Sequence, residues 1–198
     1  MSTIKKLAGQ TAVYGLSSIL GRLLNYLLVP IYTWPGNYAP AEYGVISEFY
    51  AYVAFLVVVL MFGMETTFFR FINKSENKEK TFNQAFSIVL VINTIFIITV
   101  LVFSQTIANL LSYPDMSNYV IWFGFILAFD ATSSLFLAKL RFLEKPKQFA
   151  VIQLSSIGVN IVFNLVFIFL FLEGNRDFGI GFVFLANLLS SIIKPILL

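Results

Sequence analysis

The 198-residue sequence contains no cysteine and no histidine, and only 12% of its residues are charged. The two missing residue types exclude disulfides, thiolate nucleophiles, imidazole bases and the commonest zinc and haem ligands. Because an ordinary soluble domain has about 25% charged residues, the low charge excludes an ordinary soluble globule as well. We therefore expect neither an enzyme nor a protein that holds a metal or a cofactor.

Apolar residues are what the sequence has in abundance, at 59% of the chain. A helix that crosses a membrane needs about 20 apolar residues, so the chain has room for about six such helices and no soluble catalytic domain. The segments that we expect to cross are Leu7–Tyr32, Tyr43–Met64, Ala85–Leu111, Val120–Ala138, Phe149–Leu172 and Phe178–Leu198. Lipid cannot satisfy free backbone groups, and these segments are too long and too uniformly apolar for barrel strands. The sequence therefore predicts an all-α, polytopic membrane protein with six transmembrane helices.

The basic residues predict an orientation for these helices. Ten of the thirteen lie in the amino-terminal tail and in the second and fourth connectors: Lys5, Lys6, Arg70, Lys74, Lys78, Lys80, Lys139, Arg141, Lys145 and Lys147. By the positive-inside rule, the amino terminus and these two connectors lie in the cytoplasm. A second interpretation is that the connector from Lys139 to Lys147 holds anionic lipid headgroups. Since the basic residues lie between apolar segments, the net charge of +3 does not indicate a nucleic-acid partner.

A stripe of polar residues runs along the first apolar segment. At helical spacing, one face carries Thr11, Gly15, Ser18, Arg22 and Asn25. A charge at mid-bilayer costs about 2.5–3.5 kcal/mol on insertion scales, so Arg22 needs a wet cavity or a partner. Its guanidinium is suited to a phosphate, which makes Ser18, Arg22 and Asn25 candidates for substrate binding. The alternative is a structural ion pair of Arg22 with an acidic residue, either Asp130 or Glu48.

A second polar stripe lies on the fifth segment, with members Gln153, Ser156, Asn160 and Asn164. Their amide groups suit the hydroxyls of a sugar or a lipid headgroup, but interhelical hydrogen bonds are an equally good explanation. Asp130, in the fourth segment, is a candidate for a proton or sodium site. It is also the candidate counter-ion of Arg22.

Several motifs together resemble those of a known family. They are residues 15–30 around Arg22, Pro40–Gly44 with its Glu-Tyr-Gly turn, Gly63–Phe71, Leu140–Lys147 and Gly179–Gly181. This pattern is similar to the amino-terminal part of polysaccharide-biosynthesis flippases, within the multidrug/oligosaccharidyl-lipid/polysaccharide exporter superfamily. Arg22 matches a basic position of that family on the first helix, where it faces the central cavity.

The resemblance implies a flippase of the inner membrane that moves a polyprenyl-diphosphate-linked oligosaccharide outward for cell-surface polysaccharides such as lipopolysaccharide. Family members have two six-helix lobes around the cavity. Residues 1–198 would then form the first lobe, and a missing carboxy-terminal lobe or a second copy would complete the cavity. The alternative function is a cation-coupled multidrug exporter of the same superfamily, which should prefer acidic residues in its cavity.

Overall fold

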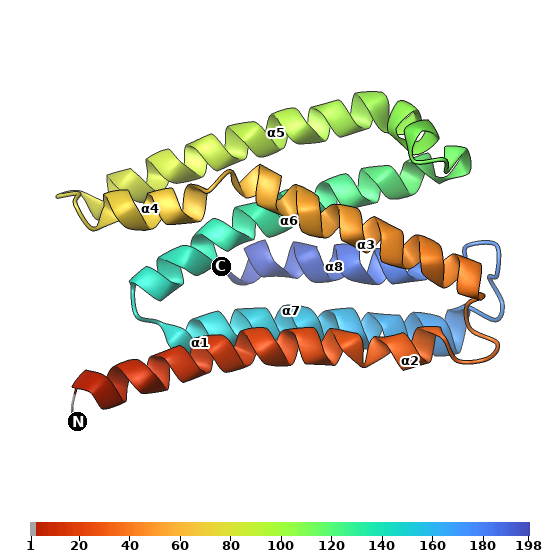
Figure 1. Ribbon diagram of the computed structural model, residues 1–198, viewed down its shortest axis with the longest axis horizontal. Helices are drawn as coiled ribbons and strands as arrows, with labels where there is room; N and C mark the ends of the chain where they lie inside the picture. The colour runs from red at the N-terminus through yellow and green to blue at the C-terminus, as the bar shows by residue number, and fades with distance from the viewer. Residues whose placement is uncertain (1–2) are drawn as a thin grey trace. The chain divides into compact units, whose positions relative to one another are not determined.

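The computed structural model describes residues 3–198, without the side chains of residues 3–7, Gln10 and Arg22. Eight α-helices, one 3₁₀ turn and one π-helical turn make up the regular structure of this range, which contains no strand (Figure 1). The α-helices are α1 Thr3–Tyr26, α2 Leu28–Tyr32, α3 Pro40–Met61, α4 Met64–Ile72, α5 Lys78–Leu110, α6 Ser117–Phe142, α7 Pro146–Val166 and α8 Gly181–Leu197. The prediction of an all-α protein is thereby confirmed.

Five helical stretches are long and apolar enough to cross a membrane: Thr11–Tyr32, Pro40–Ile72, Lys78–Leu110, Pro114–Phe142 and Pro146–Phe171. They correspond to the first five predicted segments, as expected of a multi-pass membrane protein. The sixth predicted segment forms α8, a helix of 17 residues. At 1.5 Å per residue α8 is about 26 Å long, against about 30 Å for a hydrocarbon core. The sixth crossing therefore stays a prediction.

Two predicted boundaries are wrong, at the end of the second segment and at the start of the third. The second segment was expected to run without interruption from Tyr43 to Met64, but Phe62 and Gly63 both adopt positive φ and separate α3 from α4. Glycine adopts this conformation without strain. The third helix was expected to begin near Ala85 and begins at Lys78, because the Asn77 side chain accepts a hydrogen bond from the Lys80 amide at 2.9 Å.

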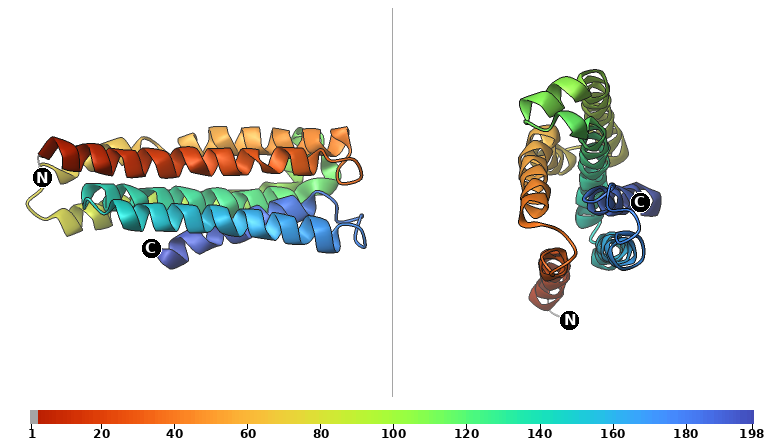
Figure 2. Two further views of the ribbon diagram at one scale, coloured as in Figure 1. Left: turned by 90° about the horizontal axis from the view of Figure 1, so that it is seen from below. Right: turned by 90° about the vertical axis from the view of Figure 1, so that its right-hand side faces the viewer.

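The chain divides into two compact units. The first comprises residues 1–45 and 139–198, and the second comprises residues 46–138. In the first unit, α7 packs against α1 on one side and against α8 on the other (Figures 1 and 2). The π-helical turn Phe167–Phe171 continues α7 to the loop that leads to α8.

In the second unit, α4 lies alongside α5, and buried residues of α3 and α6 form a small core. The contact between α5 and α6 includes a polar group, since Asn93 Nδ2 donates to Thr132 Oγ1 at 2.9 Å. At Gly124 the α6 backbone lies so close to Val100 that an added Cβ would come within 2.8 Å of that side chain. Small residues at such positions let membrane helices approach one another closely.

Candidate functional site

Close packing of α1 against α7 positions the polar residues of the first unit. Tyr14 lies edge-on to Phe149 with ring centroids 5.1 Å apart, and Ser17 is buried one turn further along α1. One turn beyond Ser17, Gly21 lies against Ile157 of α7. These three α1 positions share one helical face, which is therefore the face that α1 presents to α7.

A Cβ at Gly21 would lie 2.5 Å from Ile157 Cδ1, so the Ile157 side chain would have to shift. We expect Gly21→Leu to lower the free energy of unfolding by about 1–3 kcal/mol, as overpacked interfaces do. Thermal unfolding in detergent measures this change. Gly15→Leu is the matched control, since nothing lies within 4 Å of a Cβ at Gly15. Equal effects of the two changes would contradict the close contact.

Beyond Gly21, four polar side chains form a continuous hydrogen-bonded chain between α7 and the α1–α2 segment. Tyr32 OH donates to Asn164 Oδ1 at 2.8 Å. Asn164 Nδ2 donates to Asn160 Oδ1 at 3.0 Å and to the Asn160 carbonyl at 2.8 Å. Asn160 Nδ2 donates to Asn25 Oδ1 at 3.2 Å. We call Tyr32, Asn164, Asn160 and Asn25 the amide chain.

The amide chain is buried at one end and open at the other. Asn164 is 1% exposed and Asn160 is 8% exposed, whereas the side chain of Asn25 is exposed. Arg22 lies one helical turn from Asn25 and directly follows Gly21 in α1; its side chain lies outside the described residues. Ser18, which is half-buried, donates to the Tyr14 carbonyl at 2.9 Å. The structure thus brings Asn25, Asn160 and Asn164 together.

The remaining polar residues of α7 behave differently from one another. Ser156 and Ser190 of α8 each donate to the other's backbone carbonyl, at 3.0 and 2.8 Å, and so join the two helices. One turn before Ser156, the half-buried Gln153 has its Oε1 atom buried without a hydrogen-bond partner among the described residues. A buried acceptor without a donor is costly, at about 1–3 kcal/mol. Gln153 Oε1 is thus a costly buried acceptor beside the α7–α8 contact.

Asp130 belongs to the second unit, in α6, where its side chain is half-buried. Ser134 Oγ donates to the Asp130 backbone carbonyl at 2.8 Å. No group of three or more acidic side chains that could hold a metal ion occurs where side chains are described. The ion-site role of Asp130 and its pairing with Arg22 both stay predictions.

Tyr32 and Glu48 make polar contacts that the sequence pattern did not predict. The sequence predicts Tyr32 at the end of a segment, in an interfacial belt of aromatic residues, yet its hydroxyl closes the amide chain. In the second unit, Glu48 accepts from Tyr52 at 2.7 Å and from Tyr113 at 2.6 Å. The bond to Glu48 raises the pKa of Tyr113, and burial adds to this effect. Tyr32–Asn164 and Tyr113–Glu48 are too distant in sequence to leave a short-range pattern, whereas Glu48 and Tyr52 are four residues apart in one helix.

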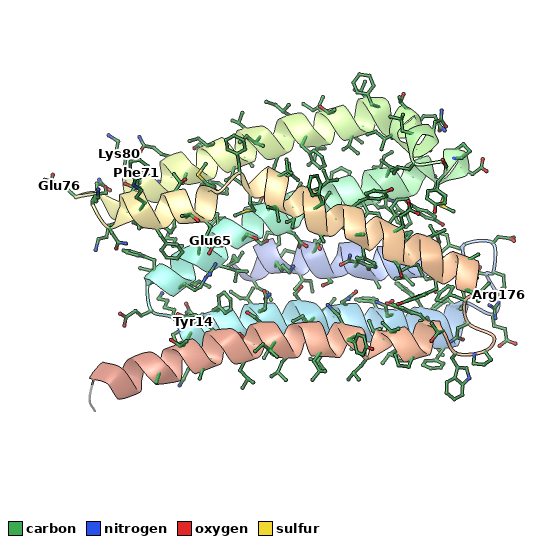
Figure 3. The ribbon with its side chains drawn as sticks, viewed as in Figure 1. Tyr14, Glu65, Phe71, Glu76, Lys80 and Arg176 are labelled. Carbon is green, nitrogen blue, oxygen red and sulfur yellow. The ribbon has the colours of Figure 1, made fainter. Side chains whose placement is uncertain are left out.

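A guanidinium holds the loop between α2 and α3. Arg176 Nη1 donates to the Asn37 carbonyl at 2.7 Å, and Nη2 donates to the Gly36 carbonyl (Figure 3). Gly36 has a φ of 98°, so the tight turn that exposes these carbonyls suits glycine.

We expect Arg176→Ala to free this loop and to raise its cleavage rate by an added protease several-fold, because two charge-assisted hydrogen bonds are lost. Limited proteolysis followed by mass spectrometry measures the rate. Lys147→Ala, which removes a positive charge from a different connector, should leave it unchanged. The same cleavage rate in wild type and Arg176→Ala would contradict the structural role of Arg176.

Comparison with known proteins yields a family match. The family model described as polysaccharide biosynthesis protein matches residues 38–194, more than half of the chain. Neither curated proteins nor solved structures give a match. The matched range contains Gln153, Asn160, Asn164 and Asp130, while the α1 residues Ser18, Arg22 and Asn25 precede it.

Proposed function

The chain belongs to the polysaccharide biosynthesis protein family, as the sequence motifs indicated, and we propose that it is a flippase. In this proposal it moves a polyprenyl-diphosphate-linked oligosaccharide across the inner membrane for cell-surface polysaccharide biosynthesis. The amino terminus lies in the cytoplasm, where the basic connectors also lie. Transport makes and breaks no covalent bond.

The observation that carries the proposal is the amide chain. Within two helices long and apolar enough to cross a membrane, it places a line of side-chain amides that ends at the exposed Asn25. Side-chain amides both donate and accept hydrogen bonds, which is what the hydroxyls of a sugar require. An exposed amide at such depth is expected to line a hydrated path, because lipid would leave its remaining hydrogen-bonding capacity unsatisfied.

Arg22 supplies the charge that this path needs. Arg22 lies one helical turn from Asn25 along α1, and in our proposal its cation serves the open end of the amide chain. A guanidinium is always charged and binds phosphate oxygens through two parallel N–H groups. In our proposal Arg22 binds the diphosphate, Ser18, Asn25 and Asn160 contact the first sugar or the headgroup, and Gln153 and Asn164 extend the polar wall.

Transport also requires the site to open to each side of the membrane in turn. We propose that residues 1–198 act as one lobe and that a carboxy-terminal lobe or a second copy supplies the facing wall. Rocking of one lobe against the other would alternate the access of the cavity. Besides this facing wall, the proposal implies two further partners, the lipid bilayer and the lipid-linked oligosaccharide.

Single introduced cysteines test whether the polar face is hydrated, and the absence of native cysteine makes each one unique. Ser18→Cys and Asn25→Cys should react with a membrane-impermeant maleimide, and added lipid-linked oligosaccharide should slow the reaction. Leu23→Cys is the matched control, because Leu23 is 52% exposed, lies on the same helix and should face lipid. Unreactive cysteines at both polar positions would indicate a scaffold and overturn the proposal.

The half-buried carboxylate of Asp130, inside a candidate span, favours one second candidate, a cation-coupled multidrug exporter. That function predicts resistance to cationic drugs that disappears in Asp130→Asn. Our proposal predicts unchanged drug sensitivity in the same variant. Resistance that depends on Asp130 would reverse the order of the two functions.

A further inference from the structure

A groove of about 400 Å³ lies between α4 and α5, and all of its lining residues belong to the second unit. On α4 it is lined by Met64, Thr67, Phe68 and Phe71, which share one helical face. On α5 it is lined by Thr81, Gln84, Ala85 and Ile88, again one face. Lys74 and Ser75 of the connector close one end.

The groove changes character along its length. Its connector end is polar, with Lys74 exposed and Thr81 Oγ1 donating to Ser75 Oγ at 2.7 Å. Two to three helical turns away, the other end is formed by Met64 and Ile88, and both are apolar. A ligand that fits must therefore be polar at one end and apolar along the rest.

The polar end is also the basic end of this unit. Residues 70–80 contain four basic side chains, at positions 70, 74, 78 and 80, against two acidic ones at 76 and 79. Figure 3 shows Phe71, Glu76 and Lys80 gathered where α4 and α5 meet their connector. The positive excess at the polar end favours an anionic head over a zwitterionic one.

The long apolar wall is open to a hydrocarbon chain. Phe71 is 58% exposed and Ile88 is 49% exposed, although both line the groove. The break at Phe62–Gly63 starts α4 as a separate helix, and α4 runs alongside α5 (Figure 1). An acyl chain lying along these side chains would cover apolar surface that is otherwise open.

We propose that this groove binds one anionic phospholipid of the surrounding bilayer, with its phosphate at Lys74 and an acyl chain along Phe71 and Ile88. This lipid is a bound component of the transporter and not its cargo. None of the lining residues belongs to the amide chain. The site therefore stands independently of the proposed function.

The test measures lipid preference at the groove with a single tryptophan. In a Trp34→Phe, Trp122→Phe background, Phe71→Trp reports contact with brominated acyl chains in vesicles. Brominated phosphatidylglycerol should quench this reporter more than brominated phosphatidylcholine at equal mole fraction. A reporter at Phe169, which is 68% exposed in the first unit, should show no such preference.

Charge variants separate a built site from general surface attraction. Lys74→Gln should weaken the preference for phosphatidylglycerol about fivefold, which corresponds to about 1 kcal/mol for one basic side chain. Lys80→Gln removes the same charge from the first turn of α5, and Lys80 does not line the groove, so this variant should keep the preference. Thr67→Trp, at an exposed position, should block the groove and reduce quenching by both lipids. Because this variant adds a tryptophan, the reporter at position 71 is then a different fluorophore.

Three results would overturn the proposal. Equal quenching by the two lipids would show that the head group is not recognised. Equal losses in Lys74→Gln and Lys80→Gln would show attraction to the basic surface alone. Unlabelled polyprenyl phosphate that competes more strongly than unlabelled phosphatidylglycerol would assign the groove to the transported lipid.

Discussion

Replacing Arg22 by alanine is expected to reduce surface polysaccharide by about tenfold or more at matched membrane expression. A hydrogen bond to a charged group contributes about 1.5–3 kcal/mol, and loss of even one lowers binding of the diphosphate by at least about tenfold. Polysaccharide extracted from the cell surface and quantified per cell measures the effect. Arg22→Lys should retain part of the output, because it keeps the charge and loses the two-pronged geometry.

The matched control for Arg22 is Arg70→Ala. Arg70 is exposed near the end of α4 and lies in the second unit. Its loss removes the same charge from the chain and should leave surface polysaccharide unchanged. Wild-type output from Arg22→Ala would remove Arg22 from the substrate site, and equal losses in both variants would indicate a general effect of charge.

Substitutions at the two ends of the amide chain are expected to affect stability and transport to different degrees. Asn164→Leu leaves the Tyr32 hydroxyl without its acceptor and the Asn160 side chain without its donor, inside the first unit. We expect it to lower the free energy of unfolding by about 1–3 kcal/mol. Asn25→Ala, at the exposed end, should change stability by less than about 0.5 kcal/mol and still lower transport about fivefold. Thermal unfolding in detergent and surface polysaccharide measure the two quantities.

Asn93→Leu controls for the loss of a buried amide. Asn93 is 3% exposed and bonds across two helices to Thr132, but it lies in the second unit and outside the amide chain. It should destabilise as Asn164→Leu does while keeping transport per folded molecule. If Asn25→Ala transports normally, the amide chain joins helices and does not bind substrate.

The sequence was enough to predict the helical class and five apolar segments that form helices long enough to cross a membrane, because apolar length alone determines them. It was not enough to predict where helices break. Phe62 and Gly63 lie in an uninterrupted apolar stretch. Their positive φ values therefore leave no signal in the hydropathy of the sequence. The early start of α5 depends on one capping side chain, that of Asn77, and the mostly polar residues that follow it gave no apolar signal for a helix.

The sequence was enough to predict which polar residues of the fifth segment share a face, but not which residues they are hydrogen-bonded to. Spacing of three and four placed Asn160 and Asn164 on one face of a helix, and the structure has them hydrogen-bonded to each other. Their outer partners, Asn25 and Tyr32, lie more than 130 positions away in the sequence. Such pairings arise from packing of helices, which a single sequence does not encode in any short-range pattern. The family match covers Asn160 and Asn164 and assigns no role to either residue.

The most direct test of the central claim is translocation in proteoliposomes. A polyprenyl-diphosphate-linked oligosaccharide is placed in the membrane, and a glycosidase added outside measures how fast sugars reach the outer leaflet. The chain, reconstituted with the proposed second lobe or as paired copies, should expose sugars faster than protein-free vesicles, and Arg22→Ala should abolish most of that gain. A rate equal to that of protein-free vesicles would contradict the proposed flippase.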